Sequence, residues 1–175
     1  MKTHNPDLYR FYGERGEDLP HRLLRPLELR FVLALRKARG SKNPFHHWRL
    51  LRLSRKSGIQ IRPRTVIGEG FYIGHTGRVI IHPDAVIGKN VNVATGVTIG
   101  QENRGVRRGV PTIGDEVWIG TNAVVVGNIR IGNDVLIAPL SFVNCDVPEH
   151  SIVIGNPARI IARENATAGY IENKV

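Results

Sequence analysis

The sequence has little of what stabilises a small secreted domain or a membrane protein. Its 175 residues contain one cysteine, Cys145, one methionine and only 6% aromatic residues. A single cysteine excludes an intramolecular disulfide and a cysteine-based zinc site. All apolar runs are far shorter than the roughly 20 residues that a membrane-spanning helix needs. The N-terminus has no apolar core of a signal peptide, so we expect a cytoplasmic protein with one domain and a small appendage.

Acidic residues are scarce in the first 60 positions. This region holds fourteen Lys and Arg against five Asp and Glu, a net charge of +9, whereas the remaining 115 residues carry +1. A cationic segment can contact anionic lipid, a phosphorylated substrate or nucleic acid, or it can be a solvated face of arginine-rich helices. Trp48 lies beside the cations between Arg49 and Lys56, which suits a membrane interface. Nucleic acid is supported by charge alone, and we expect no such partner.

The N-terminal region has apolar residues at helical spacing. The first predicted helix begins at Pro20, where a missing N–H costs nothing, and ends near Gly40. Its apolar stripe consists of Leu24, Leu27, Phe31 and Leu35. A second helix is expected to begin with Asn43 as N-cap before Pro44 and to end at the C-terminal cap Gly58.

From residue 61 the chain repeats every six residues. A two-residue slip follows the first four aliphatic positions, and a polar segment interrupts the series after the eighth. Period six matches neither an α-helix nor a heptad, so it predicts a solenoid in which each hexapeptide is a short strand and a turn, with the aliphatic residues stacked inside. The aliphatic positions are Ile61, Ile67, Ile73, Val79, Ile81, Ile87, Val93, Ile99, Ile113, Ile119, Val125, Ile131, Ile137 and Val143.

Two further positions share this period. Four places after the aliphatic residue, a small or branched residue is expected to fill a corner: Thr65, Ala85, Val91, Val97, Val117, Ala123, Val135 and Ser141. Glycine often follows the aliphatic residue directly, at Gly68, Gly74, Gly88, Gly100, Gly114, Gly120 and Gly132. We expect these glycines to relax backbone constraints at the turns between faces.

Residues 43–163 resemble the hexapeptide-repeat acyltransferases, in the serine acetyltransferase-like branch. The resemblance rests on IGEGFYIGH, on GVTIG before a loop, on PTIGDEVWIGTNAVVVGNIRIG and on DVPEHSIVIGNPARII. It implies an all-β fold, a left-handed parallel β-helix with a short N-terminal α-helical region, and a homotrimer. The expected regions are a basic helical region (1–60), a catalytic β-helix (61–160) with an excluded loop (101–112), and a tail (161–175).

His75 is the expected general base. It follows Gly74 in a turn just before the slip, and such an irregularity turns a side chain out of a uniform wall. O-acetyl transfer needs a base for the hydroxyl proton, and the pKa of imidazole suits this task. In the resembled family a histidine at this position is the base, and the serine-acetylating branch has an aspartate at the position of Gln60 to hold its second nitrogen. The carbonyl of Gln60 is expected to accept the ring N–H without adding charge, unless Gln60 is simply solvated.

The acceptor is expected to differ from serine. The serine-acetylating pattern has an aspartate where this chain has Gly74, and Arg-His where it has Gly109 and Val110, so residues that would hold an amino acid's charges are missing. The stretches IGEGFYIGH and GNPARII look most like members that acetylate sugar hydroxyls in capsule or exopolysaccharide synthesis. Serine stays the alternative because the nearby Arg107 and Arg108 are able to compensate.

The excluded loop QENRGVRRGVPT is expected to border the acceptor and the pantetheine arm of acetyl-CoA. Its candidate substrate residues are Asn103, Arg104, Arg107 and Arg108. For acetyl-CoA, the resemblance implies four small residues along the coils and two arginines near the CoA phosphates. These are Gly120, Thr121, Ala138, Pro139, Arg159 and Arg163. The alternative for the four small residues is a structural role at tight corners, and for the two arginines a place on the surface of a C-terminal cap of the solenoid.

The sequence therefore predicts an acetyl-CoA-dependent O-acetyltransferase acting on a sugar or polysaccharide precursor, with direct attack and no acyl-enzyme. A zinc-dependent carbonic anhydrase on the same fold is disfavoured, since it needs three converging histidines, and we expect no metal. His82, before Pro83-Asp84, is expected to serve a turn, and Cys145 to be buried filler. The remaining alternative from another class is a non-catalytic or membrane-surface scaffold.

Overall fold

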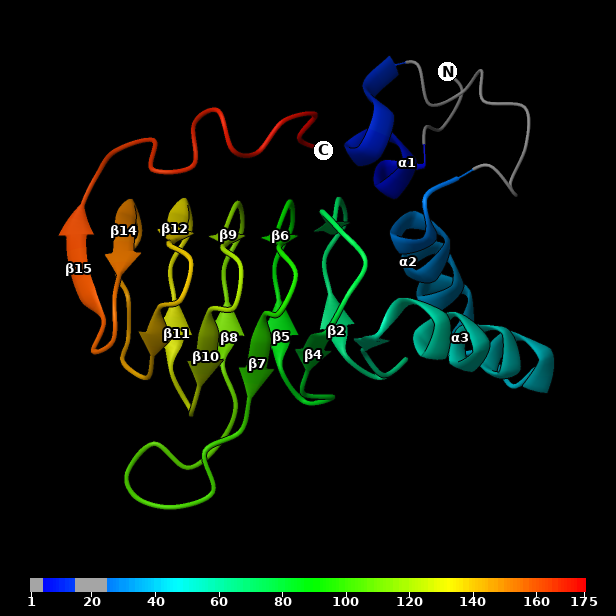
Figure 1. Ribbon diagram of the computed structural model, residues 1–175, viewed down its shortest axis with the longest axis horizontal. Coiled ribbons are helices and arrows are strands. Elements are labelled where there is room, and N and C mark those ends of the chain that lie inside the picture. The colour runs from blue at the N-terminus through cyan, green and yellow to red at the C-terminus, as the bar shows by residue number, and fades with distance from the viewer. Residues whose placement is uncertain (1–4, 15–24) are drawn as a thin grey trace.

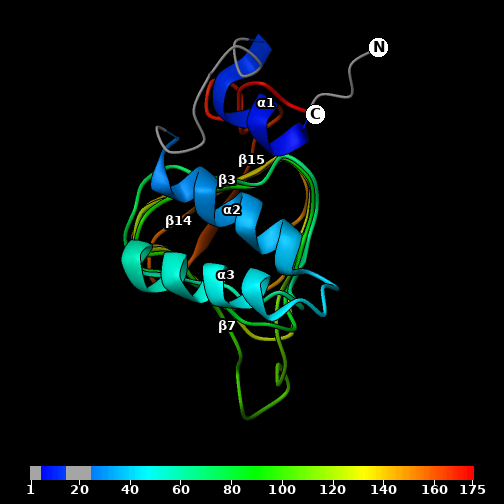
Figure 2. The ribbon, with the colours of Figure 1, turned by 90° about the vertical axis from the view of Figure 1, so that its right-hand side faces the viewer.

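The computed structural model describes residues 5–14 and 25–175, which form a β-solenoid with helices at one end. The helices are α1 (Pro6–Tyr12), α2 (Leu27–Ala38) and α3 (Pro44–Ser57). Helices α2 and α3 cross the end of the first coil, and α1 lies above them beside the C-terminus (Figures 1 and 2). The solenoid therefore has one end covered by helices.

Three sheets form the walls of the solenoid, and each coil contributes one short strand to each wall. Sheet A contains β1 (Ile59–Gln60), β4 (Val79–Ile81), β7 (Thr98–Gly100), β10 (Val124–Val126) and β13 (Phe142–Val143). Sheet B contains β2 (Val66–Ile67), β5 (Val86–Ile87), β8 (Thr112–Ile113) and β11 (Arg130–Ile131). Sheet C contains β3 (Tyr72–Ile73), β6 (Asn92–Val93), β9 (Trp118–Ile119), β12 (Val135–Ile137), β14 (Ser151–Ile154) and β15 (Arg159–Ala162).

The period-six residues form the core, as predicted. All fourteen aliphatic positions and all eight small or branched positions of the repeat are buried. Strands pair in parallel with their counterparts one coil away, for example Ile67 with Ile87 and Ile87 with Ile113. Among the strands of the described chain, β15 alone runs antiparallel, against β14. The stacking of like residues on one another confirms that each hexapeptide is one strand and one turn.

The predicted role of the glycines is wrong. None of the seven repeat glycines has a positive φ. Two residues after five of them φ is positive instead, at Gly70, Asn90, Glu116, Asn122 and Asp134. At five of the seven positions glycine instead supplies space for the next coil, whereas a Cβ on Gly74 or Gly100 would meet no atom closer than 3.4 Å. The five are Gly68, Gly88, Gly114, Gly120 and Gly132. A Cβ on Gly68 would lie 2.6 Å from the backbone of Gly88 in the next coil. Close approach of neighbouring coils, rather than backbone freedom, explains glycine at the corner between sheets B and C.

The two-residue slip is confirmed as a longer turn. Ile73 and Ile81 are eight residues apart, whereas the same step takes six residues from Val93 to Ile99. The extra residues lie in the turn between β3 and β4, and β4 then returns to register with β1 and β7. The first coil therefore carries a wider turn at the corner between sheets C and A.

The caps of α3 match the prediction, but the start of the preceding helix does not. The side chain of Asn43 accepts from the N–H of Phe45, and Gly58 adopts the left-handed conformation at the C-terminal end. Helix α2 begins only at Leu27, with Pro26 at its N-cap, and ends at Ala38. Pro26 disfavours a helical residue before it, and this restriction explains the later start. Pro20 and Leu24 lie outside the described residues.

Helix α1 was not predicted, although the sequence encodes its start. The side chain of Asn5 accepts from the N–H groups of Asp7 and Leu8, and Pro6 occupies the first turn. The helix is held to the first coils by Arg10, which donates to the carbonyl of Gly70 at 3.1 Å. Such contacts across 60 residues are invisible to local patterns.

The C-terminal segment after β15 runs back along the solenoid toward α1 (Figure 1). Asp134 accepts hydrogen bonds from the N–H groups of Ala166 and Thr167, and Asn90 exchanges two hydrogen bonds with Val175. Tyr170 packs on Trp118, with ring centroids 4.9 Å apart. The segment therefore lies along sheet C, whose strands contribute Trp118 to this contact.

Candidate active site

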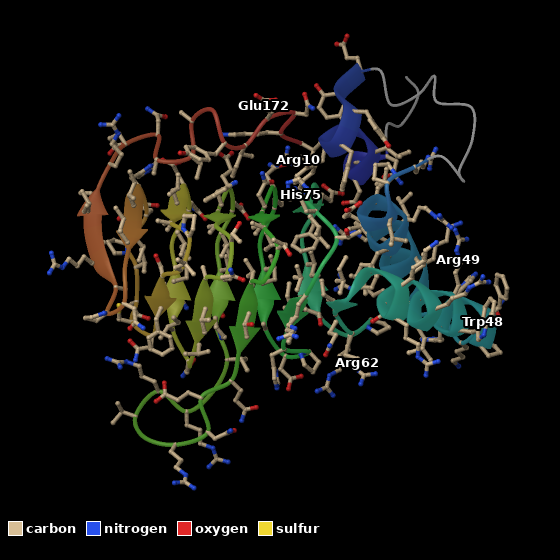
Figure 3. The ribbon with its side chains drawn as sticks, in the orientation of Figure 1. Arg10, Trp48, Arg49, Arg62, His75 and Glu172 are labelled. Atoms are coloured by element: carbon tan, nitrogen blue, oxygen red, sulfur yellow. The ribbon has the colours of Figure 1, made fainter. Side chains whose placement is uncertain are left out.

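His75 lies exposed in the wide turn between β3 and β4, on the first coil (Figure 3). The turn is fixed from both sides. The N–H of Gly77 donates to the carbonyl of Ser57 at the end of α3, at 2.9 Å. On the other side, Thr95 Oγ1 donates to the carbonyl of Thr76 at 3.5 Å. The imidazole is thus presented to solvent by a turn whose backbone is braced by a helix end and by the next coil.

The corresponding turns of the later coils form a continuous edge with the turn of His75, at the corner between sheets C and A. Backbone hydrogen bonds link each turn to the next: Asn122 to Thr95, Leu140 to Thr121, and Phe142 to Gly155. Four of the predicted acetyl-CoA residues lie on this edge, namely Gly120, Thr121, Ala138 and Pro139. The fold therefore brings these four residues onto the same edge as His75, one and two coils beyond the turn of Thr95.

Packing between coils explains the small residue type at some of these four positions but not at all of them. A Cβ on Gly120 would lie 2.6 Å from the nitrogen of Pro139, so coil stacking alone requires glycine there. Thr121 and Ala138 are half-buried, and Pro139 is exposed. Along this edge, small side chains leave the backbone accessible to an extended ligand such as a pantetheine arm. Small residues at these positions are compatible both with an acetyl-CoA site and with the packing of the coils.

The two predicted arginines lie apart. Arg159 begins β15 and pairs with Ile154, next to Gly155 at the end of the edge. Arg163 follows the other end of β15, where its N–H donates to the carbonyl of His150 at 2.7 Å. Their Cα atoms are four steps apart along an extended strand, about 13 Å. Only Arg159 lies at the same corner as the predicted acetyl-CoA residues.

The predicted substrate loop projects from a different corner. It connects β7 of sheet A to β8 of sheet B and extends below the coils in Figure 1. Backbone hydrogen bonds between Glu102 and Gly109 close it, and Thr112 belongs to β8. Its four candidate residues are exposed: Asn103, Arg104, Arg107 and Arg108. One chain therefore does not place this loop at the corner of His75.

Gln60 and His75 are both described, and no hydrogen bond joins their side chains. Gln60 is exposed at the end of β1 and lines a hollow of about 750 Å³ between α3 and sheet A, together with Arg62 and His82. His82 Nδ1 accepts from the N–H of Asp84 at 3.2 Å, which gives this histidine the turn role expected of it. The hollow was not predicted from the sequence, because it arises where α3 meets the first coils.

The three histidines of the coil region occupy three different corners. His75 lies between sheets C and A, His82 between A and B, and His150 between B and C. Among residues 5–14 and 25–175, no group of three or more His, Cys, Asp or Glu side chains is placed to hold a metal ion. Cys145 is half-buried rather than fully buried.

His150 belongs to a cluster that binds the C-terminal segment. Its Nδ1 lies 2.9 Å from Asp134, and this hydrogen bond raises the pKa of His150. Burial alone would raise the pKa of Asp134, but hydrogen bonds from His150, Thr167 and Ala166 outweigh it and lower that pKa to about 2. The Asp134–His150 pair therefore has a structural role, since it holds the C-terminal segment through Ala166 and Thr167.

Comparison with known families gives the context for this geometry. Residues 111–145 match the family described as Bacterial transferase hexapeptide (six repeats). Serine acetyltransferase 2 of Arabidopsis thaliana is 41% identical over 110 residues, which cover 63% of this chain and 34% of that protein. Serine acetyltransferase of Bacillus pumilus is 39% identical over 107 residues, covering 61% and 49%. The chain spans about a third to a half of the curated relatives it matches.

Solved structures extend the likeness over most of the chain. Soybean serine acetyltransferase complexed with serine superposes with a TM-score of 0.73 at 30% identity, covering 89% of this chain and 67% of that one. The Neisseria gonorrhoeae serine acetyltransferase in complex with serine gives 0.72 at 31%, covering 90% and 66%. These matches confirm the predicted left-handed parallel β-helix. All four of these relatives are serine acetyltransferases, and none is a capsule or exopolysaccharide enzyme.

Proposed function

This chain belongs to the hexapeptide-repeat acyltransferase family, and from that premise we propose that it transfers an acetyl group from acetyl-CoA to a hydroxyl, with His75 as general base. The observation that carries the proposal is the exposed imidazole on a braced, widened turn at the head of an edge of small residues. A base must reach both the acceptor and the thioester, and the edge that His75 shares with the candidate acetyl-CoA residues supports this role.

The proposed mechanism is a direct attack within a ternary complex. A ring nitrogen of His75 takes the acceptor's hydroxyl proton as the oxygen attacks the thioester carbonyl carbon. The tetrahedral intermediate then collapses, the carbon–sulfur bond breaks, and the imidazolium returns the proton to the leaving thiolate of CoA. Gln60 enters only if its side chain leaves the hollow beside α3. The small residues at 120–121 and 138–139 would hold the pantetheine arm, and Arg159 the phosphates.

Serine is the acceptor that the comparisons favour, because these relatives are serine acetyltransferases. The second candidate, a sugar hydroxyl, is favoured by the residues themselves. Gly74, Gly109 and Val110 stand where the serine-acetylating pattern carries charged or imidazole side chains, so an amino acid's charges lack those partners. Arg107 and Arg108 are exposed on the loop and available to bind a carboxylate instead.

The assembly proposed is a homotrimer in which two copies build each site. His75 and the loop with Arg107 lie at different corners of one chain. In a cyclic trimer, the corner of His75 on one copy meets another corner of its neighbour. A site between copies therefore reconciles the two predicted halves.

Thiol release from acetyl-CoA tests the proposal, with serine, free hexoses, nucleotide sugars and short oligosaccharides as acceptors. The expected result is acceptor-dependent release, reduced about 10²- to 10⁴-fold by His75→Ala. His46→Ala is the matched control, since it removes a histidine of α3 that contacts Ser41 and lies at no corner of the solenoid. Full activity in His75→Ala would refute the general base. Release with serine alone would assign the acceptor to serine, and release with saccharides alone to a sugar.

A further inference from the structure

An exposed apolar stripe runs along the outer face of α3. Phe45, Trp48 and Leu51 are spaced by three residues and are 57%, 53% and 48% exposed. The opposite face of the helix is the packed one, because Leu50 and Leu53 join the buried core. Figure 3 shows Trp48 near the end of α3 that points away from the coils. The stripe is therefore surplus to the packing of this chain's described residues.

Cations border the stripe. Arg52 lies over the ring of Trp48, with its guanidinium carbon 5.7 Å from the ring centroid, and Arg55 and Lys56 are exposed one turn further on. Between Glu28 and Glu69 the sequence has eleven Lys and Arg and no Asp or Glu. The helix surface thus combines exposed aromatic rings with positive charge that no acidic residue of this stretch offsets.

We propose that this α3 face, formed by Phe45, Trp48, Leu51, Arg52 and Arg55, binds the surface of an anionic lipid bilayer. Aromatic and aliphatic side chains enter the boundary between headgroups and acyl chains, while arginines at their edge contact lipid phosphates. Charge complementarity supplies the attraction and the apolar stripe supplies the insertion. No helix of the described residues is long and apolar enough to cross a bilayer, so the contact is peripheral.

Two other occupants fit the face less well. A second copy meeting this one through the same face would bring arginines of like charge together, which costs free energy. A single-stranded nucleic acid would stack its bases on aromatic rings. The ring of Trp48 is already stacked on Phe45, with centroids 5.7 Å apart, and contacts Arg52. An anionic bilayer needs neither a free ring face nor a pairing of like charges.

Co-sedimentation with vesicles tests the proposal on the full chain. Vesicles of phosphatidylcholine containing phosphatidylserine are expected to bind the protein, and phosphatidylcholine alone to bind it much more weakly. Raising the salt concentration weakens the binding. On binding, the fluorescence of Trp48 shifts to shorter wavelength, and this shift disappears in Trp48→Phe, which retains Trp118 as the second tryptophan.

Two pairs of variants separate the face from overall charge and hydrophobicity. Arg52→Glu removes one positive charge and adds a negative one, so binding falls about 20- to 30-fold. Arg130→Glu makes the same change on sheet B and leaves binding within about twofold. Trp48→Ala weakens binding at least tenfold, whereas Val86→Ala, on the solenoid wall, does not. Circular dichroism confirms that each variant keeps its helices.

The proposal is overturned by either of two results. The first is the absence of binding to phosphatidylserine vesicles. The second is binding that Arg52→Glu and Arg130→Glu reduce equally, since this would indicate a general effect of net charge. If Trp48→Ala instead abolishes a concentration-dependent association seen by ultracentrifugation without vesicles, the α3 face is an interface between copies.

Discussion

At the scale of single residues, Asp134 and His150 form a hydrogen-bonded pair that anchors the C-terminal segment. Asp134 accepts from His150, from the N–H groups of Ala166 and Thr167, and from the Thr167 hydroxyl at 2.7 Å. The pKa of Asp134 falls from 3.8 to about 2, and that of His150 rises above 6.5. The anchoring of the segment therefore weakens both at low pH, where Asp134 is protonated, and at high pH, where His150 loses its proton.

The pH dependence follows from these directions. Asp134 stabilises the fold fully above its unfolded pKa, and the contribution is lost as pH falls from about 4 toward 2. His150 contributes below pH 6.5, and its contribution is lost as pH rises through its raised pKa. We predict that Asp134→Asn lowers the free energy of unfolding by about 1–2 kcal/mol. This is less than the free energy equivalent to the whole pKa shift of Asp134, because its partner His150 is partly exposed to solvent.

Urea denaturation of both proteins from pH 3 to pH 9 measures this prediction. The difference in unfolding free energy should be largest between about pH 4 and 6.5 and should shrink above that range. Asp84→Asn is the matched control, because its carboxylate lies 3.9 Å from His82 and is exposed, and we expect a change within about 0.5 kcal/mol. A difference for Asp134→Asn that is the same at pH 5 and pH 9 would exclude a contribution from His150.

At the scale of elements, the end of α3 supports the turn of His75. Gly58 ends the helix with a φ of 79°, and the carbonyl of Ser57 beside it accepts from the N–H of Gly77. A Cβ on Gly58 would lie 3.1 Å from the carbonyl carbon of Gly77. Any side chain at position 58 therefore both strains the helix end and presses on the turn.

We predict that Gly58→Ala destabilises the protein more than Gly40→Ala. Both glycines have positive φ, which costs about 1–2 kcal/mol for alanine. Nothing lies within 4 Å of a Cβ on Gly40, so that variant measures the backbone cost alone. Gly58→Ala should cost about 1 kcal/mol more in chemical denaturation. If both variants lose the same free energy of unfolding, the turn of His75 accommodates the added methyl group without destabilising the fold.

At the scale of the whole molecule, the solenoid separates the two halves of the proposed site. The parallel register places His75 at one corner and the loop of Arg107 at another. A three-walled solenoid does not bring two of its corners together within one copy. If the site is shared in a trimer, inactive variants of different halves complement each other.

Mixing tests this sharing. His75→Ala and the double variant Arg107→Ala, Arg108→Ala are each expected to lose most acetyl transfer. Unfolded together, mixed in equal amounts and refolded, they should recover about a quarter of the wild-type activity, since random assembly pairs an intact half with an intact half in that fraction of sites. Light scattering gives the mass of the assembly as control. A mixture no more active than its components would place both halves of the site in one copy.

The sequence by itself determined the repeat, the buried residues, the wide turn and the caps of α3. These are local properties, because a six-residue period records which side chain faces inward in each short strand, and Asn43 and Gly58 act within one helical turn. The position of His75 followed from the same local count, since two extra residues between Ile73 and Ile81 have no place except the turn.

The tertiary structure alone decided how distant segments meet. It set the reason for glycine at position 68, the path of the C-terminal segment along Trp118, the contact of Arg10 with Gly70, and the location of Gln60 in a hollow beside α3. These contacts join residues that are distant in the sequence, such as Gly68 and Gly88 or Gln60 and His82, and a periodic pattern does not predict which of them meet. The six-residue period predicts which sheet of the solenoid a residue belongs to. Only the packing of the coils determines which distant residues contact that sheet.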